Sequence, residues 1–223
     1  MGFDKYLSHY GPYELQPFED RETFEKHIKD KHECLLLLSS WHFKIISKDY
    51  CLSFALAGLR DGKKYQRRVL VAQSTVSGIE ALKGARIASS SSVQHTRSVL
   101  AGIFDEKEAA LDTKILAVPK EIDALMSVAF GMSKGALTTR NAFDELKTVN
   151  PKLYEKMKIL AEGQESFLLI LAVPESFMEQ AAQPVNVIKS MPMNPDGKKK
   201  MRMLGLDGWQ EPDPSDRNKL EAK

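Results

Sequence analysis

The fold is decided by one stretch, Ser77-Gly-Ile-Glu-Ala-Leu-Lys-Gly-Ala-Arg-Ile-Ala-Ser-Ser-Ser-Ser-Val-Gln-His-Thr-Arg-Ser-Val-Leu-Ala-Gly-Ile-Phe104. A short apolar run at 85–88 follows the turn signal Lys83-Gly84 and predicts a buried strand. From Val93 to Phe104 the apolar residues recur at helical spacing. The four serines at 89–92 lie between these two segments. The stretch therefore predicts a strand, a polar elbow and a helix.

The serine elbow at 89–92 is a candidate anion site. Serine is favoured just before a helix because its hydroxyl accepts a hydrogen bond from an N–H group of the first turn. The same position gathers hydroxyl donors, unpaired N–H groups and the positive end of the helix dipole, which suits a phosphate, phosphonate, sulfate or carboxylate. His95 and Thr96 can add donors from the first turn. A flexible loop with a simple helix cap would need the same serines, so this stretch alone leaves both interpretations open.

The composition indicates a globular chain with no strong electrostatic preference for a polymeric partner. The 223 residues are 43% hydrophobic, which is enough for one large domain or two smaller lobes. The formal net charge is only +2, and the basic run at 198–202 lacks the aromatic groups and wide basic face of a nucleic-acid site. We therefore expect no nucleic-acid partner. We also expect no membrane span, since no apolar run approaches about 18 residues.

Two features bear on the compartment in which the protein works. The start of the chain shows no secretory signal, so either a leader was removed or the protein is cytosolic. The two cysteines, Cys34 and Cys51, are too few for a disulfide framework. They can pair if neighbouring strands bring them together, and the alternative is two free thiols in the core.

Strands and helices are expected to alternate along the chain. The strands are expected at 13–18, 34–38, 52–59, 65–72, 85–88, 114–118, 136–138, 156–160 and 167–173. The helices are expected at 3–10, 21–31, about 43–47, 93–104, 121–130, 142–146, 177–183 and 185–191, with Pro184 separating the last two. The apolar part of the polar tail, 204–209, is expected to dock on the body. The alternation predicts an α/β fold in which mostly parallel sheets are flanked by helices.

Three predicted strand ends carry clustered hydroxyl groups. In open α/β sheets, ligands bind outside the carboxyl ends of the strands. One hydroxyl-rich elbow means little, but three in a single chain favour an oxyanion site. The residues are Ser39 and Ser40 with His42 after the first, Ser90, Ser91 and Ser92 with His95 after the second, and Thr138, Thr139 and Arg140 after the third.

The motifs of common enzymes are not visible in the sequence. There is no Gly-x-Ser-x-Gly elbow, no P-loop and no Gly-x-Gly-x-x-Gly. The five histidines and two cysteines show no spacing typical of a metal site. A serine beside His95 does not form a catalytic triad without an orienting acid within reach. We therefore expect a binding protein rather than an enzyme, with no cofactor and no metal.

The stretch Ser77-Gly-Ile-Glu-Ala-Leu-Lys-Gly-Ala-Arg-Ile-Ala followed by the serine cluster resembles the phosphate- and phosphonate-binding family of periplasmic solute-binding proteins. These proteins serve ABC importers. The Leu82-Lys83-Gly84 step and the closing segment Leu204-Gly-Leu-Asp-Gly-Trp209 are similar to segments of that family. The resemblance implies two α/β lobes joined by crossing strands, with a small anionic ligand closed between them. It also implies a periplasmic or extracytoplasmic location and an ABC permease as partner.

The resemblance places the lobes and the binding residues. Lobe one is expected at 1–73 plus 165–223, and lobe two at 74–164. The hydroxyls of 90–92 are implied to hold the phosphoryl oxygens, with His95 close by, and Tyr65 matches a ligand-facing tyrosine near the hinge. Ser39, Ser40 and His42 match the elbow of lobe one. Met1 falls in what resembles the first helix of the family, so lobe one is expected to be truncated at its start.

Other readings of the same chain remain open at this point. An aspartate common in the family after the glycine of 131–136 is missing, and its loss argues for a plain oxyanion or a different ligand. One alternative is a ligand-sensing regulatory domain of a sensor or transcription factor. Another is a cytosolic enzyme on a related two-lobed fold. The lack of a visible leader is compatible with both alternatives.

Overall fold

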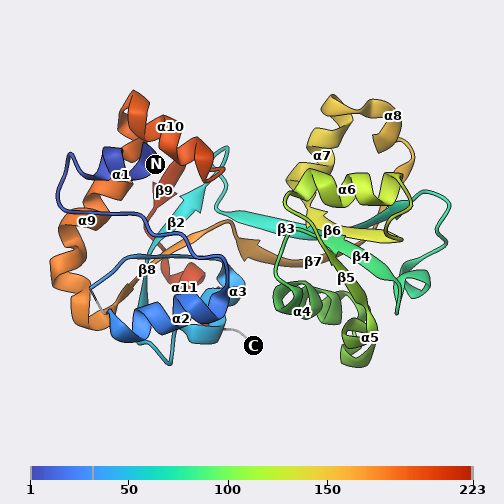
Figure 1. Ribbon diagram of the computed structural model, residues 1–223, viewed down its shortest axis with the longest axis horizontal. Helices are drawn as coiled ribbons and strands as arrows, with labels where there is room; N and C mark the ends of the chain where they lie inside the picture. The colour runs from blue at the N-terminus through green and yellow to red at the C-terminus, as the bar shows by residue number, and fades with distance from the viewer. Residues whose placement is uncertain (1, 32, 222–223) are drawn as a thin grey trace. The chain divides into compact units, whose positions relative to one another are not determined.

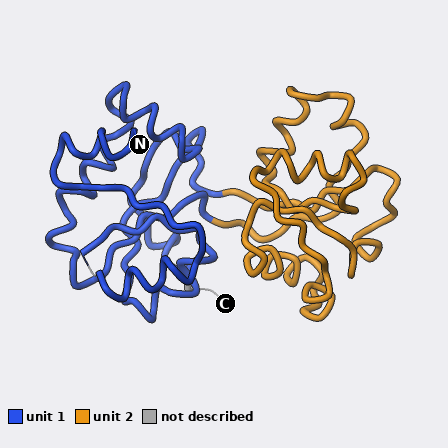
Figure 2. The backbone as a smooth tube through the Cα atoms, in the orientation of Figure 1, with its two compact units in different colours: residues 1–65, 167–223 blue, residues 66–166 orange. Residues whose placement is uncertain are grey.

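The chain forms two compact units in the computed structural model, which describes residues 2–31 and 33–221 (Figure 2). Unit 1 consists of the residues up to 65 and those from 167 onward, and unit 2 of residues 66–166. The sequence led us to expect the divisions after 73 and after 164. The two long strands near these positions, β3 (Tyr65–Gln73) and β7 (Met157–Phe167), belong almost wholly to unit 2 in the structure.

Unit 1 contains a four-stranded sheet in the order β1-β8-β2-β9 (Figure 1). All of its pairs are antiparallel, so the expectation of a mostly parallel sheet was wrong for this unit. The reason is that β8 lies between β1 and β2, which both run opposite to it. The strands are β1 Leu36–Leu38, β2 Leu52–Leu59, β8 Ile170–Pro174 and β9 Gly208–Gln210.

The sheet of unit 1 is covered by apolar side chains on both faces. Along β8, Ile170 and Ala172 belong to one buried cluster and Leu171 to another, as the alternation of a strand requires. Trp209 of β9 is buried in the second cluster together with Leu206. The expected docking of the segment 204–209 is thus confirmed. Residues of α1, α9 and α10 also belong to this second cluster. The helices of unit 1 are α1 Gly2–Leu7, α2 Arg21–Asp30, α3 Ser40–Ile46, α9 Met178–Ser190, α10 Pro195–Met203 and α11 Pro214–Glu221.

Three local expectations in unit 1 were wrong. Residues 13–18 form no strand. Pro184 does not interrupt α9, because Ala181, Pro184 and Val187 are buried on one face of a continuous helix. Cys51 is an exposed free thiol rather than a core one, and Cys34 is half-buried and also free.

Unit 2 contains a five-stranded mixed sheet in the order β5-β4-β6-β3-β7 (Figure 1). The pairs β4–β5 and β4–β6 are parallel, whereas β3 and β6 are antiparallel. One buried cluster packs α6 (Glu121–Ala129) and α7 (Arg140–Val149) on the sheet, and a second cluster packs α4 (Val93–Phe104) and α5 (Lys107–Asp112) on it. The strands are β3 Tyr65–Gln73, β4 Arg86–Ser89, β5 Lys114–Ala117, β6 Gly135–Thr139 and β7 Met157–Phe167.

Three helices of unit 2, α4, α6 and α7, follow strands as the sequence predicts, whereas the short helices α5 and α8 were not predicted. The helices are α4 Val93–Phe104, α5 Lys107–Asp112, α6 Glu121–Ala129, α7 Arg140–Val149 and α8 Pro151–Tyr154. The described residues of the two units also form the 3-10 turns η1 Ile79–Leu82, η2 Glu175–Phe177 and η3 Met191–Met193. Because β4, β5 and β6 run parallel, their carboxyl ends meet at one edge of the sheet. The starts of α4, α6 and α7 therefore meet at this edge as well. This edge carries the site described below.

The polar tail of the chain is fixed to unit 1 through Asp216 of α11, whose side chain is fully buried. Its carboxylate accepts hydrogen bonds from Lys64 Nζ at 2.7 Å, from the amide of Asp213 at 2.9 Å and from the hydroxyl of Tyr65. The ammonium of Lys219 lies 3.7 Å from the centre of the Tyr65 ring. These contacts join α11 to Lys64 and to Tyr65, the first residue of β3.

Replacing Asp216 by Ala should destabilise unit 1 by about 3 kcal/mol, because it removes the buried partner of Lys64 and Tyr65. Both tryptophans, Trp41 and Trp209, belong to unit 1, so tryptophan fluorescence during urea unfolding reports this unit. Asp49→Ala removes an exposed carboxylate from the same unit and serves as the control. Equal midpoints for the two variants would contradict a stabilising role of Asp216.

Candidate functional site

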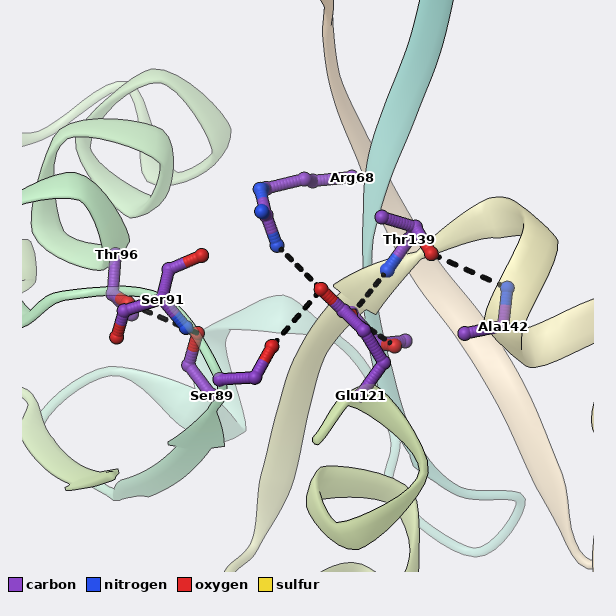
Figure 3. A network of polar contacts seen from close by, with 9 residues as sticks. Arg68, Ser89, Ser91, Thr96, Glu121, Thr139 and Ala142 are labelled. Atoms are coloured by element: carbon purple, nitrogen blue, oxygen red, sulfur yellow. Dashed lines mark hydrogen bonds and ion pairs between the residues drawn. The ribbon is translucent and has the colours of Figure 1, made fainter. Parts of the chain in front are cut away.

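The site of unit 2 is centred on Glu121, the first residue of α6. Its carboxylate accepts hydrogen bonds from Ser90 Oγ at 3.0 Å and Thr138 Oγ1 at 2.6 Å. The amide of Thr139 donates to it at 2.8 Å, and Arg68 Nη1 lies 3.3 Å from it (Figure 3). These donors come from the β4–α4 elbow, from the end of β6 and from β3.

Three of the residues predicted for the site, Ser90, Thr138 and Thr139, are thus brought together. They surround a carboxylate of the chain itself. Burial alone would raise the pKa of Glu121, but the charge of Arg68 and the donors of Thr138, Thr139 and Ser90 outweigh it and hold the pKa below its ordinary value. The carboxylate is therefore ionised at neutral pH.

The serine elbow itself is held by a second set of hydrogen bonds. The buried hydroxyl of Thr96 donates to Ser89 Oγ at 3.0 Å, and the amide of Ser91 donates to the same oxygen at 3.2 Å (Figure 3). Ser92 is the N-cap of α4, and its hydroxyl oxygen accepts from the amide of His95 at 3.3 Å. The elbow is thus an ordered helix start rather than a flexible loop.

The start of α4 retains capacity to bind an anion. The first four N–H groups of a helix lack partners within the helix. Among the described residues, Ser92 satisfies those of His95 and Thr96, which leaves those of Val93 and Gln94 for an external acceptor. The first turn of α4, all of it described, holds no acidic residue that would offset the positive end of the helix dipole.

Arg140 and Arg68 differ from what the sequence suggested. Arg140 is half-exposed and forms ion pairs with Asp144 at 3.2 Å and Glu162 at 2.7 Å, so it is not part of the shell around Glu121. The cation of the shell is Arg68, whose side chain is only 12% exposed. A guanidinium carries five N–H donors, and Arg68 uses Nη1 for Glu121. Its remaining N–H groups add to the donors at this edge.

Sequence reasoning missed Arg68 and Glu121 for different reasons. Arg68 lies within a predicted strand, and nothing in the apolar pattern of that strand distinguishes its position. Glu121 opens a helix, where an acidic residue is commonly explained by the helix dipole alone. The available signal was that Glu121 follows Pro119 directly after the strand predicted at 114–118. The hydroxyl-rich segments also follow the ends of predicted strands.

The predicted site residues of unit 1 are Ser39, Ser40 and His42 in the elbow at the start of α3, and Tyr65 at the start of β3. Ser40 and Tyr65 both contact Phe167. Ser39 caps α3 by accepting from the amide of His42 at 3.2 Å, and the buried hydroxyl of Ser40 donates to the carbonyl of Phe167 at 3.1 Å. His42 Nε2 lies 3.0 Å from a carboxylate oxygen of Glu25, and burial lowers the pKa of His42 despite this carboxylate. The hydroxyls of this elbow therefore have partners within unit 1.

Tyr65 is engaged at both its hydroxyl and its ring. Its hydroxyl donates to Asp216, and its ring packs on Phe167, with 4.8 Å between the ring centres. Burial and the Asp216 carboxylate raise the pKa of the phenol. Within unit 1, Phe167 is the residue that Ser40 and Tyr65 both contact.

Residues 2–31 and 33–221 contain neither a metal-type cluster nor a membrane-type helix. In this part of the chain, no group of three or more histidine, cysteine, aspartate or glutamate side chains is placed to hold a metal ion. None of its helices combines the length and the apolar character that crossing a bilayer requires.

Several solved structures share the fold of the chain over almost its whole length. A protein from Xanthomonas citri bound to ATP has a TM-score of 0.72 at 12% identity, over 99% of this chain and 87% of that chain. The binding component of an ABC phosphonate transporter from Pseudomonas aeruginosa has a TM-score of 0.70 at 13% identity, over 99% and 78%. PhnD1 from Prochlorococcus marinus in complex with methylphosphonate has a TM-score of 0.68 at 14% identity, over 99% and 88%.

The comparisons define the fold of the chain. No protein-family model matches the sequence, and no curated protein matches it either. The likeness over almost the whole chain confirms the predicted α/β periplasmic-binding-protein fold, with two sheets flanked by helices. These similar structures are mainly binding proteins, and two of them are named for phosphonate transport or bound to methylphosphonate.

His95 provides a test of the electrostatics of this edge. Burial and, to a lesser extent, the charge of Arg68 lower its pKa to about 4, and the charge of Glu121 opposes this shift. An unfolded chain binds a proton at this histidine near pH 6.5, so stability from His95 is complete above about 6.5 and is lost as the pH falls toward 4.

Between pH 7 and pH 4.5, unit 2 of the wild type should therefore lose about 1–3 kcal/mol more stability than unit 2 of His95→Gln. Hydrogen exchange of amides in 66–166 measures this unit separately. The difference between the two proteins removes the contributions of other titrating groups, such as His42 and Glu25. Identical pH profiles would mean that His95 is not buried as described.

Proposed function

We propose that the protein is a solute-binding protein that captures a small ligand through an oxyanion head at the start of α4. The observation that carries this proposal is the helix start itself. It combines hydroxyls of Ser91 and Ser92 and N–H groups of Val93 and Gln94 with Arg68 nearby, and its first turn has no acidic residue. Helix starts of this kind bind phosphate-like groups through amide donors and the dipole.

The comparisons support the same function. The similar structures include a binding component of a phosphonate transporter and a methylphosphonate complex. By this analogy, the ligand belongs to the phosphate, phosphite or phosphonate class, an ABC permease receives it, and the protein works outside the cytoplasm. The role requires no catalysis.

A thermal-shift screen with phosphate, phosphite, methylphosphonate and sulfate tests the proposal. A ligand that binds only the folded state raises the melting temperature. At least one of these anions should raise it in the millimolar range, at constant ionic strength. The absence of any shift with every anion would contradict an oxyanion site.

Ser91→Ala and Ser92→Ala should each weaken binding of the anion by about 1–3 kcal/mol, because each removes a hydroxyl donor to a buried acceptor. Isothermal titration calorimetry at a temperature where all variants are folded measures the affinity. This precaution matters for Ser92, whose loss also removes the cap of α4.

Ser98→Ala is the matched control, since Ser98 is an exposed serine on the same helix. Its affinity should equal that of the wild type. Unchanged affinity in both elbow variants would place the anion elsewhere.

A further inference from the structure

The carboxylate of Glu121 has no acceptor capacity left. A carboxylate offers about four lone-pair sites, two on each oxygen. One oxygen of Glu121 receives Ser90 Oγ and Arg68 Nη1, and the other receives Thr138 Oγ1 and the amide of Thr139. A cationic group of a ligand would have to displace one of these donors to bind here. Glu121 is therefore a fixed internal anion.

We propose that Glu121 is a specificity-determining residue that admits an oxyanion head with a single negative charge at the start of α4 and disfavours a dianion. The inference rests on the function proposed above and narrows its substrate class. The shell around Glu121 is formed by the same elbow that begins α4, since Ser90 donates to Glu121 and Ser91 and Ser92 follow it directly.

The charges at this edge explain the discrimination. Arg68 carries one positive charge and Glu121 one negative charge, so the ion pair contributes almost no net field. His95 is neutral at pH 7 because burial lowers its pKa to about 4. The remaining positive potential comes from the start of α4, which is equivalent to about half an elementary charge.

A second negative charge makes a ligand much more costly to remove from water, and half an elementary charge offsets little of that cost, so the edge suits a ligand with a single negative charge. Glu121 cancels the charge of Arg68, which would otherwise stabilise a second negative charge in this partly buried environment, where interactions between charges are stronger than in water. Neutral hydroxyl and amide donors can hold the oxygens of either ion, so the charge of Glu121 decides between them.

Sulfate and methanesulfonate form a suitable pair of probes. Both have a tetrahedral sulfur with at least three oxygens, and their charges of −2 and −1 do not change near neutral pH. Calorimetry at constant ionic strength should give methanesulfonate an affinity about tenfold or more above that of sulfate in the wild type.

In Glu121→Gln the affinity for sulfate should rise by about tenfold or more, while that for methanesulfonate changes much less. Glu121→Asp keeps the charge and should keep the preference for methanesulfonate. Glu108→Gln removes an exposed carboxylate from the same unit and should behave as the wild type. Circular dichroism establishes that each variant is folded at the temperature used.

The outcomes separate the two proposals. If neither the wild type nor Glu121→Gln binds any anion, the proposed function fails, and this inference fails with it. If the wild type binds sulfate as tightly as methanesulfonate, the oxyanion site stands but the role of Glu121 is refuted. If Glu121→Gln does not fold, the comparison of the two ions in the wild type and in Glu121→Asp still decides.

Discussion

One largely buried carboxylate holds together the functional edge of unit 2. Glu121 joins the start of α6 to β3 through Arg68, to the β4–α4 elbow through Ser90 and to the end of β6 through Thr138 and Thr139. An ionised carboxylate leaves water only if other donors replace its hydration. All these elements must therefore be in their observed positions before the Glu121 carboxylate can be buried with its hydrogen bonds formed.

The individual elements could be predicted because their signals are local. The strand 52–59 was predicted with the bounds that the structure has, since its apolar run ends at a turn around Asp61-Gly62. Pairing could not be predicted in the same way. β8 joins the sheet between β1 and β2 from more than a hundred residues away, and an apolar strand looks the same beside a parallel or an antiparallel neighbour. Segment 13–18 shows the reverse case, an alternating pattern that forms no strand.

The site could be predicted only in part, for a related reason. Hydroxyl clusters at strand ends are visible in the sequence, and the parallel order of β4 and β6 brings Ser90 close to Thr138 and Thr139. The sequence does not show which charge those hydroxyls face. A cation was expected from Arg140, but Asp144 lies one helical turn after it and draws it to the surface, an i,i+4 pairing that the sequence already contained. The cation comes instead from the middle of a strand.

The same charges connect the stability of this edge with its selectivity. A polar network in which every lone pair is used is rigid, so the serine elbow needs little reorganisation when an anion arrives. The ion pair of Arg68 with Glu121 leaves the edge nearly neutral, which means that affinity has to come from hydroxyl and amide dipoles. Such dipoles recognise the arrangement of the ligand oxygens, whereas the fixed charge of Glu121 limits the negative charge that the ligand can carry. A site built in this way separates the recognition of shape from the recognition of charge.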